Sequence, residues 1–209
     1  MARSRLTPDQ RRDQILDLGM AAFSVLPFEQ VAMEDIAAQA EISRALIYHY
    51  FPSKKELFAA LWARAHEKLA HDAHFTDADT LRAQIRGALV AHFSFYEHHM
   101  TLMMIANRSA IAADPVVRSP ITFELTRLRD LTLDALELTG PGRDLVSVAL
   151  SGWLALVREV ALEWLELQSF SRDTAVDLCM TALDALVSPH AAEIWACAAF
   201  SVSLAKICV

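Results

Sequence analysis

Apolar residues recur along almost the whole chain at intervals of three and four positions, and only rarely at intervals of two. This spacing puts apolar side chains along one face of an α-helix, whereas a half-buried strand needs strict alternation. Hydrophobic residues make up 54% of the 209 residues, and there are only five glycines and seven prolines. That composition supports a large core with short connections. The sequence therefore predicts an all-α protein.

Capping and stop residues divide this pattern into about nine helices. Thr7, Pro8 and Gln10 form a helix start with a capping box, and Pro27 ends the first helix. Asp114–Pro115 and Gly140–Pro141–Gly142 are each expected to end the helix before them. The other predicted ranges are 33–40, 44–50, a long helix from 54, then 79–98, 102–112, 119–138, 144–167 and 173–187.

The last twenty residues, 190–209, are nearly all apolar. They fit a last helix packed on the bundle or on a partner subunit, a disordered tail, or a contact with a membrane surface. The sequence does not choose between these interpretations.

The net charge of −7 is unevenly distributed. Residues 1–55 hold seven basic and seven acidic residues, whereas the remaining 154 hold twelve and nineteen. An acidic chain argues against nucleic-acid binding, but a local cluster of cations still acts on phosphates within about 8 Å. Arg3, Arg5, Arg11 and Arg12 form such a basic cluster near the N-terminus.

Cysteine usage and hydropathy predict a cytoplasmic protein without a membrane segment. Cys179, Cys197 and Cys208 are far apart, as expected for reduced thiols. The first residues are polar and hold no apolar signal region. The longest apolar run, residues 145–157, is bounded by charges and is shorter than the roughly 20 residues that span a bilayer.

Residues 33–50 form a helix-turn-helix pattern, in which two short helices are joined by a three-residue turn. The major groove of DNA is about 12 Å wide and admits one helix. Ser43 is expected to cap the second helix, and Leu46 and Ile47 to anchor it. Arg44 and Ala45 are at its N-terminal end, where side chains of this motif read base edges.

Other polar residues nearby are candidates for contacts with the DNA backbone. Tyr48, His49 and Tyr50 can hydrogen-bond phosphates, and Lys54 stands at a helix N-terminus, where free amides favour an anion. The predicted DNA-binding residues are Ser43, Arg44, Ala45, Tyr48, His49, Tyr50 and Lys54.

The stretch VAMEDIAAQAEISRALIYHYFPSKKELFAAL, residues 31–61, resembles the DNA-binding segment of the TetR/AcrR family of bacterial transcriptional regulators. With the first helix, the resemblance covers about residues 8–62. It is carried by Asp35-Ile36-Ala37, Ser43, Tyr48, Phe51, Lys54 and Leu57.

Three positions depart from the pattern of that family. Glu41 occupies the turn where glycine is common, and glutamate tolerates a left-handed backbone poorly. Val31 and Ala32 offer no hydroxyl to cap the helix that follows. Ala45 replaces a smaller, glycine-like residue.

The resemblance implies a DNA-binding domain at residues 1–53, followed by a helical effector-binding and dimerisation domain at residues 54–209. It also implies a homodimer built from helices near 144–187. Gly152 would allow close helix approach there, and Trp153 and Trp164 are either interface anchors or core residues of one subunit.

The family's effector pocket lies among the helices after residue 54. Met-rich, aromatic space suits an apolar or aromatic effector, although each candidate can equally be a core residue. The candidates are Trp62, His66, Phe93, Tyr96, Met100, Met103, Met104, Asn107 and Phe123.

No catalytic or metal chemistry is predicted. The histidines at 66, 71, 74, 92, 98 and 99 lack cysteines or acids at ligand spacing, and no nucleophile–base pair or phosphate loop is present. We therefore expect no cofactor, no metal and no enzymatic activity.

The leading hypothesis is a repressor that binds double-stranded operator DNA and is released by its effector through a population shift. One alternative is a constitutive DNA binder without an effector. Another is a helical ligand-binding or scaffolding protein that has lost its affinity for DNA.

Overall fold

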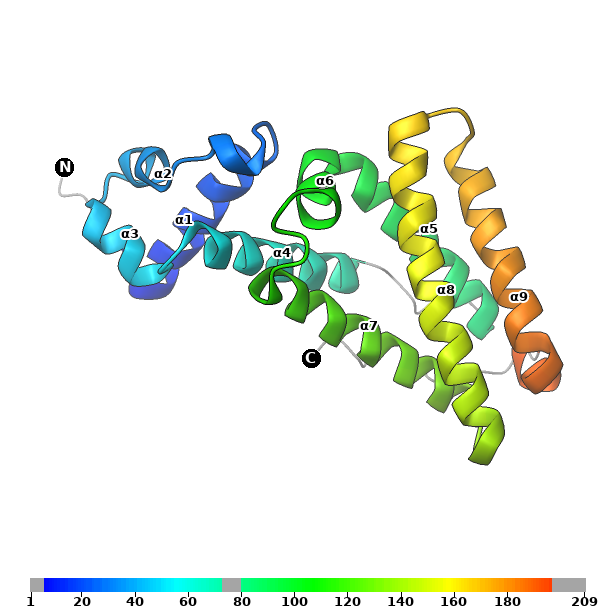
Figure 1. Cartoon of the computed structure of the whole chain (residues 1–209). Coiled ribbons are helices and arrows are strands. Elements are labelled where there is room, and N and C mark those ends of the chain that lie inside the picture. Colours follow the sequence, from blue (N-terminus) through cyan, green and yellow to red (C-terminus); the bar gives the residue numbers. More distant parts are fainter. Residues whose placement is uncertain (1–5, 73–79, 197–209) are drawn as a thin grey trace. The chain divides into compact units, whose positions relative to one another are not determined.

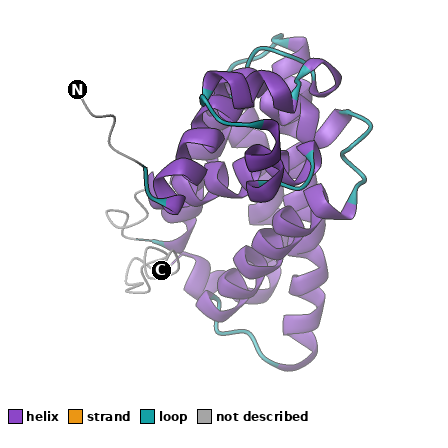
Figure 2. Ribbon diagram, turned by 90° about the vertical axis from the view of Figure 1, so that its left-hand side faces the viewer, coloured by secondary structure: helices purple, strands orange, loops and turns teal. Residues whose placement is uncertain are grey.

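The computed structural model describes residues 6–72 and 80–196, with side chains placed up to residue 67 and over residues 80–190. The described residues form nine α-helices and one short 3-10 turn, with no strand among them (Figures 1 and 2). The prediction of an all-α protein is therefore confirmed. The apolar tail from residue 197 onward lies outside the described residues.

The helices pack as two compact units. The first comprises residues up to 65 together with 99–121, and the second comprises residues 66–98 together with those from 122 onward. Packing thus groups the first half of the long fourth helix with the helix-turn-helix. The functional boundary between residues 53 and 54 stays a prediction.

The first unit holds the helix-turn-helix and the helices that support it. In chain order it contains α1 (Pro8–Phe23), η1 (Phe28–Gln30), α2 (Met33–Gln39), α3 (Arg44–Tyr50), the first part of α4 (Lys54–Asp72), α6 (Met100–Arg108) and the start of α7 (Pro115–Ala135). The capping box expected at Thr7 and Gln10 is present, because each side chain bonds the backbone N–H of the other residue.

Aromatic rings form the core of the first unit. Phe23 lies 5.2 Å from Phe58 and 5.9 Å from Phe28 between ring centroids, and Trp62 stacks on Phe58 at 6.5 Å. Gly19 lets α1 approach α4 closely, because an added Cβ there would meet a Leu61 methyl group at 3.1 Å. The core therefore fixes α1 against the helix that follows the DNA-binding motif.

The second unit is built from α5 (Leu81–His98), the later part of α7, α8 (Gly140–Leu167) and α9 (Arg172–Ala196). In Figure 1, α8 and α9 lie side by side, and α5 packs against both. Trp153 and Trp164 are each 8% exposed, and their indole N–H groups donate to the carbonyls of Cys179 and Phe170. The two tryptophans are therefore core residues of one chain, and the interpretation as interface anchors is wrong.

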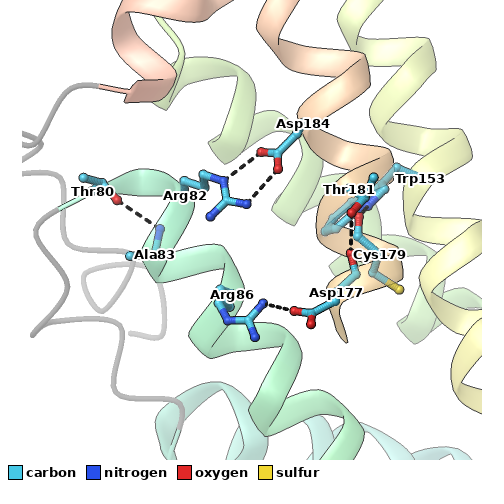
Figure 3. Close-up of polar contacts among 9 residues, drawn as sticks. All are labelled: Thr80, Arg82, Ala83, Arg86, Trp153, Asp177, Cys179, Thr181 and Asp184. Atoms are coloured by element: carbon cyan, nitrogen blue, oxygen red, sulfur yellow. Dashed lines mark hydrogen bonds and ion pairs between the residues drawn. The ribbon is translucent and has the colours of Figure 1, made fainter. Parts of the chain in front are cut away.

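Ion pairs connect α5 to α9. Arg82 donates two hydrogen bonds to the carboxylate of Asp184, at 2.8 and 2.7 Å, and Arg86 donates to Asp177 at 2.6 Å (Figure 3). The two parallel hydrogen bonds between Arg82 and Asp184 fix the relative orientation of the two side chains. Because the pairs are partly exposed, we expect them to fix the register of the two helices more than to stabilise the fold.

Several prolines and glycines lie on the other side of a helix boundary from the one that the sequence predicts. Asp114–Pro115 begins α7 instead of ending α6, because the Asp114 carboxylate accepts a hydrogen bond from the Val116 N–H at 3.0 Å. Gly140–Pro141 likewise begins α8. Pro120 and Pro189 lie inside α7 and α9, so α9 extends well beyond the predicted end at residue 187.

Candidate nucleic-acid interface

The turn between α2 and α3 is a Schellman motif. The N–H of Ile42 donates to the carbonyl of Ala37 at 3.0 Å, and the N–H of Glu41 donates to that of Ala38 at 3.1 Å. Arg11 of α1 adds a side-chain hydrogen bond to the carbonyl of Ala40 at 3.2 Å. The end of α2 is thus held from both sides, and this sets the direction in which α3 leaves.

Glu41 has a φ of 54°, in the left-handed region. This is the position of the motif that glycine usually occupies, and a residue with a Cβ costs about 1–2 kcal/mol there. The conflict between residue and turn that the sequence indicated is therefore real. The turn keeps its regular hydrogen bonds despite the cost.

Ser43 caps α3 as predicted, because its Oγ accepts a hydrogen bond from the Leu46 N–H at 3.2 Å. Ile47 is fully buried and Phe51 is 3% exposed, so these two side chains anchor the helix. Leu46 was also expected to be an anchor, but it is 36% exposed. One turn of helix separates the anchors, and Leu46 lies on the outward side.

The outward side of α3 carries the predicted DNA-binding residues. Ala45 and His49 are exposed, and Tyr48 and Tyr50 are half-buried. The Arg44 side chain is 74% exposed, and its guanidinium lies 5.6 Å from the centroid of the Tyr48 ring. Their contact with DNA stays a prediction, but these residues share the outward side of α3.

Lys54 has partners that the sequence did not indicate. Its ammonium donates to the carbonyls of Phe28 at 2.7 Å, Val31 at 2.8 Å and Glu29 at 3.3 Å. It also lies 4.6 Å from the centroid of the Phe28 ring. An ammonium has three donors, so all three are directed at the chain itself, and the phosphate contact expected of Lys54 would require giving up one of them.

We predict that Lys54→Met lowers the free energy of unfolding by about 2 kcal/mol, because charge-assisted bonds to the 28–31 segment are lost while the aliphatic stem remains. Denaturant unfolding of the whole chain measures this. Lys55→Met is the matched control, since Lys55 is about half exposed and its partner among the described residues is the Asp114 side chain, not the 28–31 backbone. Equal stability losses in both variants would contradict the assignment.

The basic cluster near the N-terminus is partly engaged as well. Arg11 bonds Gln14 and Ala40, and the Arg12 guanidinium lies 5.0 Å from the centroid of the Phe51 ring. Arg3 and Arg5 lie outside the described residues. At the start of α2, Ala32 provides no side-chain cap, as the sequence indicated.

The nine candidate effector residues divide between the two units. Trp62, Met100, Met103, Met104 and Asn107 belong to the first, and His66, Phe93, Tyr96 and Phe123 to the second. Most are buried or half-buried, but Met100 is 40% and Phe123 is 68% exposed. Asn107 donates to the carbonyl of Met103 at 2.9 Å. A shared pocket stays a prediction.

His92 on α5 is a polar group that sequence reasoning did not select for the effector site. Its Nε2 is buried and has no hydrogen-bond partner among the described residues, and its ring centroid lies 4.4 Å from that of Tyr96. Burial, and secondarily the charge of His66, lower the pKa of His92 to about 3. No sequence pattern marks it, because its burial depends on how the helices pack. In the described part of the chain, no group of three or more metal-binding side chains gathers.

The sequence and the fold of this chain are similar to those of known proteins. Residues 15–61 match the profile of bacterial regulatory proteins of the tetR family. The HTH-type transcriptional activator FasR of Mycolicibacterium smegmatis is 26% identical over 179 residues, which cover 83% of this chain and 81% of FasR.

Two solved structures are similar over most of the chain. A TetR-like transcriptional regulator from Rhodococcus sp. RHA1 is 32% identical, with a TM-score of 0.61, over 87% of this chain and 98% of its own. A tetR-family transcriptional regulator from Streptomyces coelicolor is 24% identical, with a TM-score of 0.73, over 97% of this chain and 90% of its own. The latter likeness supports the fold.

Proposed function

Because this chain belongs to the TetR family of bacterial transcriptional regulators, we propose that it binds operator DNA as a homodimer and responds to a small apolar or aromatic effector. The observation that carries this proposal is the exposed outward side of α3 with Arg44, Tyr48 and His49, while the Ser43 cap and the Ile47 anchor hold the helix. Side chains at the start of such a helix reach base edges in the major groove. We propose no enzymatic activity and no cofactor.

The proposed dimer surface is an apolar stripe on α8. Leu145 is 57%, Val148 73% and Leu156 38% exposed, and Gly152 and Ala155 between them are also exposed. These five residues are here called the α8 stripe. Their spacing of three and four, with the adjacent pair Ala155 and Leu156 at one end, places them on one helix face. An apolar face of this length left open to water favours association with a second copy.

The α8 helix is also long and apolar enough, by length and composition alone, to cross a membrane. The core helix of a soluble protein passes the same test, and Val146, Leu150 and Trp153 of α8 are buried against the rest of the second unit. One face of α8 is buried in the core of the second unit, and the α8 stripe on another face is exposed. This arrangement supports a helix that lies between the core of its own chain and a partner subunit.

The direction of regulation is part of the proposal. We propose repression that the effector relieves, by favouring a dimer whose recognition helices no longer match successive major grooves. FasR, the relative named above, is an activator. Transcription in vitro from a promoter that carries the selected binding site, with and without added protein, distinguishes the two signs.

Selection from a pool of random duplex DNA tests the binding itself. Wild-type protein should enrich a two-part sequence with half-sites about one helical turn apart, and its affinity should fall with salt. Failure to enrich any sequence would favour the alternative of a ligand-binding or scaffolding protein without DNA affinity. The left-handed Glu41 and the uncapped start of α2 are the observations that support that alternative.

We predict that Arg44→Ala weakens binding to the selected sequence roughly tenfold or more, because a bidentate contact to guanine contributes about 1–3 kcal/mol. Binding titrations with labelled duplex measure this. Arg127→Ala is the control, since Arg127 also forms a surface ion pair, with Glu124 on α7. If Arg44→Ala bound the selected sequence as tightly as the control did, α3 would not be the reading helix.

A screen of apolar and aromatic compounds for release of the selected DNA tests the effector. Release by a compound class supports the proposed regulator, whereas unchanged binding throughout favours the constitutive DNA binder.

A further inference from the structure

Glu34, the second residue of α2, reaches across to the recognition helix. Its Oε1 lies 3.0 Å from Nε of Arg44 and 3.3 Å from the hydroxyl of Tyr48, which donates to it. The Arg44 guanidinium in turn lies over the Tyr48 ring. Two side chains of α3 thus converge on one carboxylate oxygen from α2, at the surface where DNA is expected.

This cluster adds little to the stability of the fold. The Arg44 and Glu34 side chains are 74% and 47% exposed, and ion pairs at that exposure are weak. Its effect is to favour one orientation of Arg44, a side chain with high rotamer entropy, against the Tyr48 ring. The first turn of α2 also favours a negative charge at Glu34, because backbone N–H groups are unsatisfied there.

The side of the guanidinium that Glu34 contacts decides what remains for DNA. The closest approach is to Nε, and within the described chain no residue accepts a hydrogen bond from the terminal Nη1 and Nη2 of Arg44. Those two nitrogens form the fork that matches O6 and N7 of guanine. Glu34 therefore holds Arg44 from behind and leaves the reading edge available.

We infer that Glu34 is a positioning residue that determines base specificity by orienting Arg44, with Tyr48 as the second contact. This inference rests on the proposed function, that α3 reads DNA. A carboxylate at this surface also repels phosphates, so it lowers binding to DNA in which Arg44 has no guanine to contact. Both effects raise the ratio of specific to nonspecific affinity.

The test compares wild-type protein with Glu34→Ala and Glu34→Gln on three kinds of duplex. These are the sequence selected by wild-type protein, the same sequence with each guanine replaced in turn, and a scrambled duplex. Failure of wild-type protein to select any sequence would remove the proposed function. The role of Glu34 is decided separately, by how discrimination changes among the variants.

We expect Glu34→Ala to bind the selected duplex more weakly and the scrambled duplex more tightly, with about a tenfold loss of discrimination at one guanine. Glu34→Gln keeps an acceptor oxygen, so its loss of discrimination should be smaller than that of Glu34→Ala. In an Arg44→Ala background, Glu34→Ala should no longer change discrimination at that guanine.

Two results would overturn the inference. If Glu34→Ala tightened binding to all duplexes by the same factor, Glu34 would act only by repelling phosphates. If discrimination were unchanged in both variants while their thermal unfolding matched wild-type protein, Arg44 would need no orienting partner. Tyr48→Phe, which keeps the ring and removes the hydroxyl, should cause a smaller loss than Glu34→Ala.

Discussion

Replacing Val148 with glutamate is expected to raise the dissociation constant of the proposed homodimer at least about 100-fold and to remove operator binding. Val148 is 73% exposed within the α8 stripe. In a two-fold symmetric dimer the same surface meets its copy, so each dimer would bury two unpaired carboxylates, at several kcal/mol each. A monomer presents one recognition helix, whereas the operator requires two about 34 Å apart.

Sedimentation velocity over a range of protein concentrations measures this change. Val25→Glu is the matched control, because Val25 is also a 73% exposed valine but belongs to the first unit, which does not contain α8. We expect the control to sediment as the wild-type dimer does. A dimeric Val148→Glu variant would require a different interface.

Lowering the pH from 7 to 5 is expected to reduce the free energy of unfolding by roughly 2 kcal/mol through His92 alone. Burial holds the pKa of His92 near 3 in the folded chain, against 6.5 for an exposed histidine. As the pH falls, the unfolded chain therefore binds the proton first, and protonation favours unfolding. The stabilisation is complete above about pH 6.5 and declines by roughly 1.4 kcal/mol for each pH unit below it.

Urea unfolding followed by circular dichroism at pH 7, 6 and 5 measures this dependence. His92→Gln should remove most of it, because glutamine takes up no proton. His98→Gln, on the same helix, leaves His92 intact and should retain it. An equal pH dependence in wild-type protein and His92→Gln would show that His92 is not buried as a neutral group.

Local features of the candidate interface were predictable from the sequence. The Ser43 cap and the Thr7–Gln10 capping box depend on residues three positions apart, so composition and spacing are sufficient to find them. The misfit of Glu41 was predictable from the resemblance to the TetR family, in which glycine is common at that turn position. Asp114–Pro115 shows the limit of such local evidence, since the same pair can end one helix or begin the next.

The roles of several polar residues were not predictable, because their partners are distant in sequence. Lys54 bonds carbonyls 23 to 26 positions earlier, so it ties the start of α4 to the segment before α2. Glu34 meets Tyr48 fourteen positions later. The charge pattern does not distinguish a lysine that binds phosphate from one that binds backbone carbonyls of its own chain. Both kinds appear in the sequence as a basic residue at the start of a helix.

By itself, the sequence determined that this protein is helical and that residues 33–50 form a helix-turn-helix. Helical periodicity, caps and turns depend on contacts within about five positions, and those are written directly into the order of residues. Only the tertiary structure decided which side chains remain available for a partner. It engaged Lys54, Trp153 and Trp164 in hydrogen bonds within the chain, and left Arg44 and the α8 stripe exposed. Whether a side chain is available to a partner depends on which helices pack together in space. Local sequence patterns do not show this, because the helices that meet are distant in the chain.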